Sequence, residues 1–467
     1  MATEATPGKD RRPYLDALGP RGPYRTLAPE PVTDVSGAEV ARLSVVPPVY
    51  VTRAMAALRR AEPPRAPDID AQLAAAAEVF ASGTVGGLEV RAYEHLVSRT
   101  SGTPLRVVRA ATRDTARFVA SARSSADQGR PRGAASGLRD DAVREGHAVW
   151  ARRGEVFAVN ASGNHPGVHR LWLEALALGY RVAVRPSRRE PFTPHRLVGA
   201  LRQAGVGEDQ VMLLPTDHRA VDTLVQGADR AVVYGGGDDV VARYAHDPRV
   251  LPQGPGRTKI LVTADTDWRA HLDTIVGSVA DEGGTACVNA TAILVEGDPA
   301  PLAEAVAGRL AALPALPPQD ERAVLPVSPL ERARALSAHL AKVAAGARAW
   351  LGGDGIVGDL GDGSAVLRPA VHQVDRADAV QLRTELPFPC VWVAPWSRSD
   401  GVGPLRDSLV LSALTRDKRL LDRLLAEPGI ANLYVGDHPT YWMAPGVPHD
   451  SYLSDFLMRS KAVIGTR

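Results

Sequence analysis

From residue 155 onward, short apolar runs alternate with amphipathic runs, and this alternation constrains the fold more than any other feature of the sequence. The apolar runs have the length of β-strands and lie at residues 156–160, 181–184, 210–214 and 230–234. The runs between them have helical spacing and lie at residues 168–176, 193–204 and 218–226. Such an alternation predicts a parallel sheet that is covered on both faces and binds ligands at the carboxyl ends of its strands.

The remaining sequence divides into segments that differ in composition and periodicity. In chain order they are a Pro- and Arg-rich arm (1–66), expected to be irregular with short helices such as 51–61, three helical patterns (69–82, 88–101 and 104–121) and a polar loop or exposed hairpin (122–138). A second α/β region runs from about residue 257 to about 433. The last segment, 434–467, contains aromatic and apolar residues broken by Pro and Gly, and we expect part of it to be a strand that packs on another subunit.

Composition excludes several classes of function. The 467 residues carry a net charge of only +2, so neither a nucleic acid nor an anionic membrane is expected as a partner. We find no run of 18 apolar residues and no signal peptide at the N-terminus, and the two cysteines give no disulfide framework. The sequence therefore predicts a cytoplasmic protein.

Cys287 is the residue with the strongest chemical potential. It lies in the run Gly-Gly-Thr-Ala-Cys (283–287), between a predicted helix (267–280) and an apolar strand (291–295). A thiol on such a loop can be exposed to substrate and activated by nearby backbone dipoles, as a covalent nucleophile requires. A lone cysteine is, however, more often a small buried hydrophobic residue.

Three further motifs follow strands of the alternating region. Asn164, in Ser-Gly-Asn-His-Pro, can donate a hydrogen bond into a substrate pocket or cap the next helix. The run Arg185-Pro-Ser187-Arg188 suits a phosphate, although exposed arginines are usually solvated. The turn Gly235-Gly236-Gly237 can bring the backbone close to a dinucleotide, but a glycine turn alone is weak evidence.

In this order and spacing, the motifs resemble those of the aldehyde dehydrogenase superfamily, over about residues 80 to 467. The run Glu385-Leu-Pro-Phe388-Pro is similar to a further motif of that family. The resemblance implies an α/β fold of two parallel-sheet domains and a small oligomerisation β-hairpin. It implies that Cys287 is the nucleophile, Asn164 the oxyanion donor and Glu385 the contact to the nicotinamide ribose, with Phe388 in the same cofactor site.

The resemblance also implies a division of the chain into domains. After the arm (1–66), the dinucleotide-binding domain comprises 67–121 and 150–256, the oligomerisation segments are 122–149 and 434–467, and the cysteine domain is 257–433. A homodimer or homotetramer is expected.

Two departures from the family pattern bear on the reaction. Gln253 and its neighbours occupy the place of the family's general-base Glu, about 34 positions before Cys287, so no carboxylate stands there. Glu282 is either a displaced base or a surface charge at a helix end. Arg185 and Arg188 replace the Lys and Glu that contact the adenosine ribose, which favours NADP(H) over NAD(H).

Without the family's base, the sequence predicts an NADPH-dependent reduction of an activated acid, an acyl-CoA or acyl adenylate, to an aldehyde through a Cys287 thioester. A small-molecule acyl substrate and an acyl-activating ligase would be the partners. The alternative is NAD(P)-dependent oxidation of an aldehyde, and a third hypothesis is a non-catalytic scaffold.

The histidines show no metal-ligand spacing, so no metal is expected. The run Pro-His449-Asp450 is interpreted as an interface turn and Cys390 as a core residue.

Overall fold

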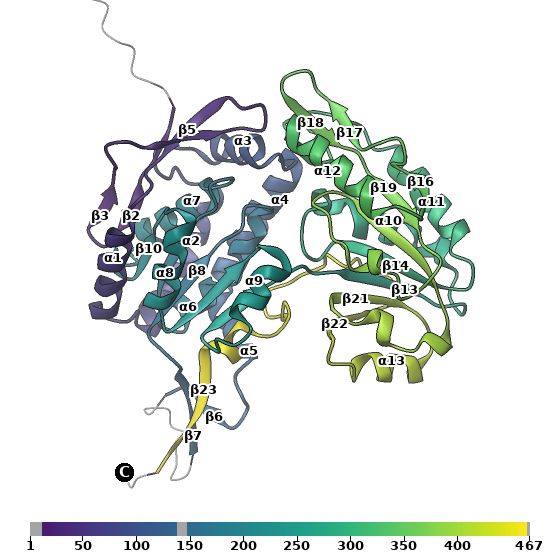
Figure 1. The fold of residues 1–467 in the computed structure, drawn as a ribbon. Helices are drawn as coiled ribbons and strands as arrows, with labels where there is room; N and C mark the ends of the chain where they lie inside the picture. The colour runs from purple at the N-terminus through teal and green to yellow at the C-terminus, as the bar shows by residue number, and fades with distance from the viewer. Residues whose placement is uncertain (1–11, 138–146, 465–467) are drawn as a thin grey trace, which may run out of the picture.

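The structure is a computed structural model that describes residues 12–137 and 147–464. The described residues form two large sheets that lie side by side, with a narrow ribbon projecting from the first (Figure 1). The chain therefore has the predicted α/β architecture.

The first sheet has seven strands within the described residues, in the order β12-β11-β8-β9-β10-β2-β3. Five strands pair in parallel: β8 (Val156–Asn160), β9 (Arg181–Arg185), β10 (Val211–Leu213), β11 (Arg230–Tyr234) and β12 (Val250–Gln253). The bounds of β8 and β11 are those predicted from their apolar runs, because both strands are buried on two faces and carry few polar residues.

Helices cover both faces of this sheet. One face packs on α2 (Ala66–Ser82), α3 (Val90–Ser101), α4 (Leu105–Ala120), α6 (Leu173–Ala177) and α7 (Phe192–Gln203). The other packs on α1 (Pro48–Arg60), α8 (Val221–Gly227) and α9 (Gly237–Tyr244). Side chains alternate between the two cores along each strand, with Phe157 in one and Ala158 in the other.

In this part of the chain, the structure differs from two predictions made from the sequence. The predicted helix over 168–176 is a 3₁₀ turn, Pro166–His169, followed by the short α6, because the turn opens with Pro and Gly. The described part of the arm is not irregular: it forms β1 (Tyr14–Leu15), β2 (Ala17–Gly19), β3 (Gly22–Tyr24), β4 (Glu30–Thr33) and β5 (Glu39–Leu43) before α1. Strands of two to five residues are too short for their periodicity to be recognised.

The second sheet has the order β16-β19-β20-β14-β13-β21-β22 in the described residues. Its parallel strands are β13 (Thr258–Val262), β14 (Ala290–Glu296), β19 (Ala370–Gln373), β20 (Cys390–Trp396), β21 (Ser408–Leu414) and β22 (Ile430–Val435), and β16 (Arg348–Leu351) is antiparallel. It lies between α10 (Leu272–Ala280) and α11 (Ala300–Ala311) on one face and α12 (Leu330–Val343) and α13 (Lys418–Leu425) on the other. A small sheet of β15 (Val327–Pro329), β18 (Ser364–Leu367) and β17 (Val357–Asp359) lies beside it.

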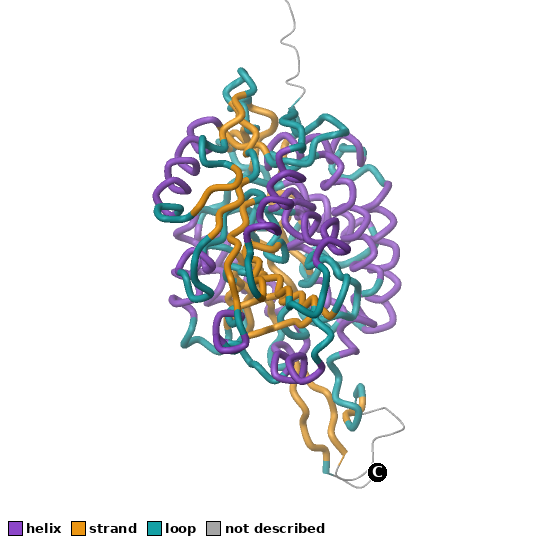
Figure 2. Tube along the Cα trace, turned by 90° about the vertical axis from the view of Figure 1, so that its right-hand side faces the viewer, coloured by secondary structure: helices purple, strands orange, loops and turns teal. Residues whose placement is uncertain are grey.

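The projecting ribbon consists of β7 (His147–Arg152) and β23 (Met458–Val463), which pair antiparallel over six residues (Figure 2). The short β6 (Ala134–Ala135) joins β7, and α5 (Ala122–Gln128) and α14 (Leu453–Leu457) lie at the base of the ribbon. The two predicted oligomerisation segments thus pair within one chain, although 138–146 and 465–467 lie outside the described residues. In the described part of the chain, no helix is both long and apolar enough to cross a membrane.

The carboxylate of Asp229 accepts hydrogen bonds at the start of the central strand β8. We expect removal of this carboxylate to destabilise the protein. The carboxylate accepts hydrogen bonds from the backbone N–H groups of Glu155 (2.8 Å) and Val156 (3.0 Å) and pairs with Arg59 of α1 (3.0 Å). Asp229→Ala leaves two donors without their partner, which we expect to cost about 1–3 kcal/mol, measured by urea unfolding. Asp273→Ala, which removes an exposed ion pair with Arg309, is the control and should cost less than about 1 kcal/mol.

The effect of Asp229→Ala should also depend on pH. Burial raises the pKa of Asp229, but the two backbone N–H groups and Arg59 outweigh burial and lower it. The carboxylate therefore stabilises the fold above the carboxyl pKa of the unfolded chain, and this contribution is lost as the pH falls through the lowered native pKa. A difference between wild type and variant that stays constant from pH 7 down to pH 2 would contradict this account.

Candidate active site

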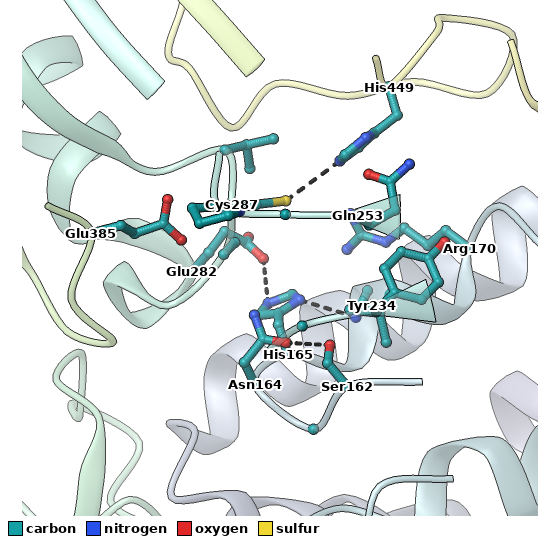
Figure 3. Close-up of a pocket in the computed structure, with 18 of the residues that line it drawn as sticks. Ser162, Asn164, His165, Arg170, Tyr234, Gln253, Glu282, Cys287, Glu385 and His449 are labelled. Carbon is teal, nitrogen blue, oxygen red and sulfur yellow. Dashed lines mark hydrogen bonds and ion pairs between the residues drawn. The ribbon is translucent and has the colours of Figure 1, made fainter. Parts of the chain in front are cut away.

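A cavity of about 470 Å³ lies where the two sheets meet. The carboxyl ends of β8 and β11 reach the cavity from the first sheet. Strands β9 and β10 continue the sheet on one side of β8 and strands β11 and β12 on the other, so the cavity lies where the direction of the strand order changes. The loops that precede β13, β14 and β20 reach it from the second sheet. Figure 3 shows the side chains that converge, among them Asn164, His165, Gln253, Glu282, Cys287, Glu385 and His449.

The loop that carries Cys287 is fixed by close backbone packing. Glu282, Gly283 and Gly284 all have left-handed φ angles of 59°, 73° and 63°, so the chain turns sharply after α10. A Cβ atom added to Gly256 would lie 1.9 Å from the carbonyl oxygen of Cys287. The Thr258 hydroxyl donates to that same carbonyl oxygen at 2.9 Å. The thiol is therefore held in a defined position, partly exposed to the cavity.

The Sγ atom of Cys287 lies 3.4 Å from Nε2 of His449 (Figure 3). On the far side of the ring, Nδ1 of His449 lies 3.5 Å from an oxygen of Asp450. The Gln253 amide donates to the other Asp450 oxygen at 3.1 Å, and the Asn432 amide donates to the carbonyl oxygen of His449. Cysteine, imidazole and carboxylate thus form a chain of polar contacts at one end of the cavity.

The interpretation of His449 and Asp450 as an interface turn is therefore wrong, since His449 lines the cavity and contacts the thiol. Burial lowers the pKa of His449, but the charge of Cys287 and the contact with Asp450 outweigh burial and raise it to about 10. The sequence gives no direct signal for this pair, because the missing carboxylate at position 253 is interpreted as favouring reduction rather than as a sign of another proton acceptor.

Asn164 lies on the opposite side of the thiol, directly after β8. The Ser162 hydroxyl donates to the amide oxygen of Asn164 at 2.6 Å, which turns the amide nitrogen toward the cysteine loop. That nitrogen donates to the carbonyl oxygen of Thr285 at 3.0 Å. An amide nitrogen has two hydrogens, so one remains for a ligand. The role of Asn164 as oxyanion donor, which would use this second hydrogen, stays a prediction.

Glu282 lines the cavity and is not a surface charge at a helix end. Its carboxylate lies 2.8 Å from Nε2 of His165, whose Nδ1 accepts from the N–H of Gly167 at 3.0 Å. Because Nδ1 is an acceptor, the proton of a neutral His165 ring lies on Nε2 and faces Glu282. Burial raises the pKa of Glu282, but His165 together with the charges of Arg170 and Arg106 outweighs burial, and the net pKa is lowered. Glu282 is thus held as an anion.

The predicted cofactor residues are divided between the cavity and its surroundings. Gly235 and Glu385 line the cavity. The three glycines after β11 have φ angles of 79°, 85° and 63°, and a Cβ on Gly236 would lie 2.1 Å from the Val240 side chain, so the turn requires glycine. One Glu385 oxygen accepts from the N–H of Arg257 at 2.9 Å, and burial raises the pKa of Glu385.

The other predicted cofactor residues lie outside this cavity. Arg185 donates to the Thr216 carbonyl and to Asn160, while its second terminal nitrogen is buried without a hydrogen-bond partner among the described residues. Arg188 pairs with Glu30 at 2.9 Å. The Ser187 hydroxyl accepts from the N–H of Arg189. Phe388 is buried and lines a separate cavity of about 170 Å³ next to the cysteine loop, as does the buried Cys390.

Comparisons with known proteins give the family of the chain and its similar proteins. The model of the aldehyde dehydrogenase family matches residues 91–402. A putative aldehyde-dehydrogenase-like protein of Sinorhizobium fredii is 27% identical over 27% of this chain and 25% of its own length. Malonate-semialdehyde dehydrogenase 1 of Geobacillus thermodenitrificans is 24% identical over 29% of this chain and 30% of its own length. These sequence matches thus span less than a third of each relative.

Solved structures match over nearly the whole chain. HpcC of Thermus thermophilus superposes with a TM-score of 0.79 at 20% identity, covering 97% of this chain and 93% of its own. AldA, an indole-3-acetaldehyde dehydrogenase of P. syringae solved with NAD⁺ and IAA, gives a TM-score of 0.82 at 16% identity, covering 97% of each chain. At such identities, the matches establish the fold.

Gly256→Ala should displace the cysteine loop, because its new methyl group has no room beside the Cys287 carbonyl oxygen. A displacement of the order of 1 Å can reduce catalysis about 100-fold. We expect Cys287 to react with iodoacetamide at least about 10-fold more slowly than in wild type. The control is Gly308→Ala in α11, where an added Cβ meets no atom within 4 Å. Equal labelling rates in the two variants would mean that this packing does not position the thiol.

Proposed function

Because this chain belongs to the aldehyde dehydrogenase family, as the match over residues 91–402 shows, we propose that it oxidises an aldehyde to a carboxylic acid with a nicotinamide cofactor. The observation that carries the proposal is the convergence of the Cys287 thiol, the Asn164 amide and the Glu385 carboxylate on one cavity. These are the nucleophile, the oxyanion donor and the cofactor contact that the family resemblance implies.

The residues around the cavity fit a nicotinamide cofactor. The glycine turn is exposed at Gly236 and Gly237, and Arg185, a buried cation with one unpartnered nitrogen among the described residues, lies at the end of β9 in the same sheet. Glu385 would contact the nicotinamide ribose. When bound, the cofactor supplies the acceptor for a hydride from the substrate. We retain NADP⁺ as the favoured form because of Arg185 and Arg188, although Glu30 partly balances the charge of Arg188.

The chemistry on the protein begins with Cys287. Its sulfur attacks the aldehyde carbon, and the negative charge that develops on the carbonyl oxygen is stabilised by the Asn164 amide and the backbone N–H of Cys287. Loss of a hydride from the same carbon leaves a thioester on Cys287. Attack of water on that thioester then releases the carboxylic acid and frees the thiolate.

Two observations favour oxidation over the reductive reaction predicted from Gln253. Glu282 and His449 both line the cavity, so groups that can accept a proton from water are present despite the amide at position 253. Several relatives of similar sequence are named as malonate-semialdehyde dehydrogenases, which supports an oxidative reaction in this part of the family. One, from Caenorhabditis elegans, is described as acylating, so coenzyme A is a second acceptor to test.

The test is incubation of the purified protein with an aldehyde panel and NAD⁺ or NADP⁺, with and without coenzyme A, while cofactor reduction is recorded at 340 nm. We expect steady turnover in buffer alone, with the carboxylic acid as product. Cys287→Ala should lower turnover at least about 1,000-fold, since the covalent step is lost. Cys390→Ala, which removes the other thiol from a buried site, is the matched control. Turnover that requires coenzyme A would overturn oxidation to the free acid.

A further inference from the structure

We propose that His449 is the acid–base residue of the Cys287 chemistry. While Cys287 carries no acyl group, the imidazole of His449 holds the proton of the thiol, so the sulfur is a thiolate. Once Cys287 carries an acyl group, the imidazole takes a proton from the attacking water. The second half of this inference rests on the proposed function, whereas the first concerns the free protein alone.

The contacts of His449 support this role. Its Nε2 atom lies 3.4 Å from Sγ of Cys287, within range for a hydrogen bond to sulfur, and its side chain is only 11% exposed. On the far side of the imidazole, the carboxylate of Asp450 lies 3.5 Å from Nδ1, an ion-pair contact without hydrogen-bond geometry, and Asp450 accepts a hydrogen bond from the amide of Gln253. An imidazole between a thiol and a carboxylate can accept the thiol proton and be stabilised as a cation.

The charged groups around the imidazole explain how its role can change. The thiol of Cys287 faces the imidazole from the cysteine loop, and Asp450 is the next residue in the chain. Tyr234, at the end of β11, lies near Cys287 and Asp450. Arg170 and Glu282 line the same cavity farther along. While sulfur is a thiolate, its charge favours the imidazolium. A thioester carries no such charge, so acylation removes one of the two negative charges that favour the imidazolium and makes the neutral ring, which is a base, easier to form.

Glu282 is less suited to the same task. Its carboxylate already contacts Nε2 of His165, and that ring is fixed by the N–H of Gly167. This contact lowers the pKa of Glu282, which weakens it as a base. Of the two groups, His449 is therefore the better candidate for the base.

The proton balance of the reaction is then complete. Thiolate attack and hydride loss convert the aldehyde into a thioester, a two-electron oxidation matched by reduction of the nicotinamide cofactor. The imidazolium of His449 releases its proton to solvent. Its neutral Nε2 takes a proton from water as the water oxygen bonds to the thioester carbon. The C–S bond breaks, the carboxylic acid leaves, and the thiolate and imidazolium are restored.

The first experiment measures alkylation of Cys287 by iodoacetamide from pH 5 to pH 10, in protein without cofactor, by mass spectrometry of the Cys287 peptide. Wild type should react at a nearly constant rate down to about pH 6. In His449→Asn the rate should follow an ordinary thiol with a pKa of about 8.5, and should be at least about 30-fold slower than wild type at pH 6. His438→Asn, an exposed histidine of the same segment, is the matched control. A wild-type profile with its midpoint near 8.5 would overturn the pairing.

The second experiment uses rapid mixing with an aldehyde and oxidised cofactor. His449→Asn should still form reduced cofactor in a burst of up to one equivalent per site above pH 9, where its thiol ionises. Subsequent turnover should be about 100-fold slower than wild type, with acyl-enzyme detectable by mass. If Glu282→Gln accumulates the acyl-enzyme and His449→Asn does not, the base is Glu282 and the proposal fails.

The two experiments separate this inference from the proposed function. If no aldehyde is oxidised but the alkylation profile depends on His449, the function fails and the thiol pairing stands. If aldehydes are oxidised and the profile is unchanged in His449→Asn, the function stands and the pairing fails. The variants should have the same urea unfolding midpoint as wild type, which shows that a lower rate does not come from unfolding.

Discussion

The close approach of Gly256 to the carbonyl oxygen of Cys287 is the constraint on which the rest of the site depends. Gly256 lies in the connection between β12 of the first sheet and β13 of the second, so this connection passes next to Cys287. Residues on either side of Gly256 hold the other groups: Gln253 donates to Asp450, and the N–H of Arg257 donates to Glu385. One short connection therefore positions Cys287, Asp450 and Glu385, the proposed nucleophile, the neighbour of His449 and the proposed cofactor contact.

The two sheets contribute to the cavity by opposite ends of their strands. In the first domain, Asn164 and the glycine turn at 235–237 follow the strands β8 and β11. In the second, Cys287 and Glu385 precede the strands β14 and β20. The proposed nucleophile and the proposed oxyanion donor thus come from different sheets, and their geometry depends on how firmly the two sheets are joined. The bond from the Asn164 amide to the Thr285 carbonyl is one direct link across that boundary.

The sequence was most informative where structure is decided locally. The central strands β8 and β11 could be predicted to the residue because they are continuous apolar runs, and Asn164 and Cys287 could be found because they sit at strand junctions with glycine. His449 could not be found in this way. It lies 162 positions from Cys287, in a segment without regular periodicity, and only the tertiary fold brings it to the thiol. The short strands β1 to β5 were missed for a different reason, since strands of two to five residues show no recognisable periodicity in a segment rich in Pro and Arg.

The amide at position 253 and the pair His449–Asp450 belong to one arrangement. The Gln253 amide donates to an Asp450 oxygen at 3.1 Å. A carboxylate at position 253 would place two like charges at about that distance, and two carboxylates so close do not both ionise. The two carboxyl groups would then share a proton, which weakens the negative charge beside His449 that favours the imidazolium. A chain that relies on an imidazole beside its cysteine therefore has a physical reason to carry an uncharged donor at 253, and the departure that first suggested a missing base becomes part of the replacement for it.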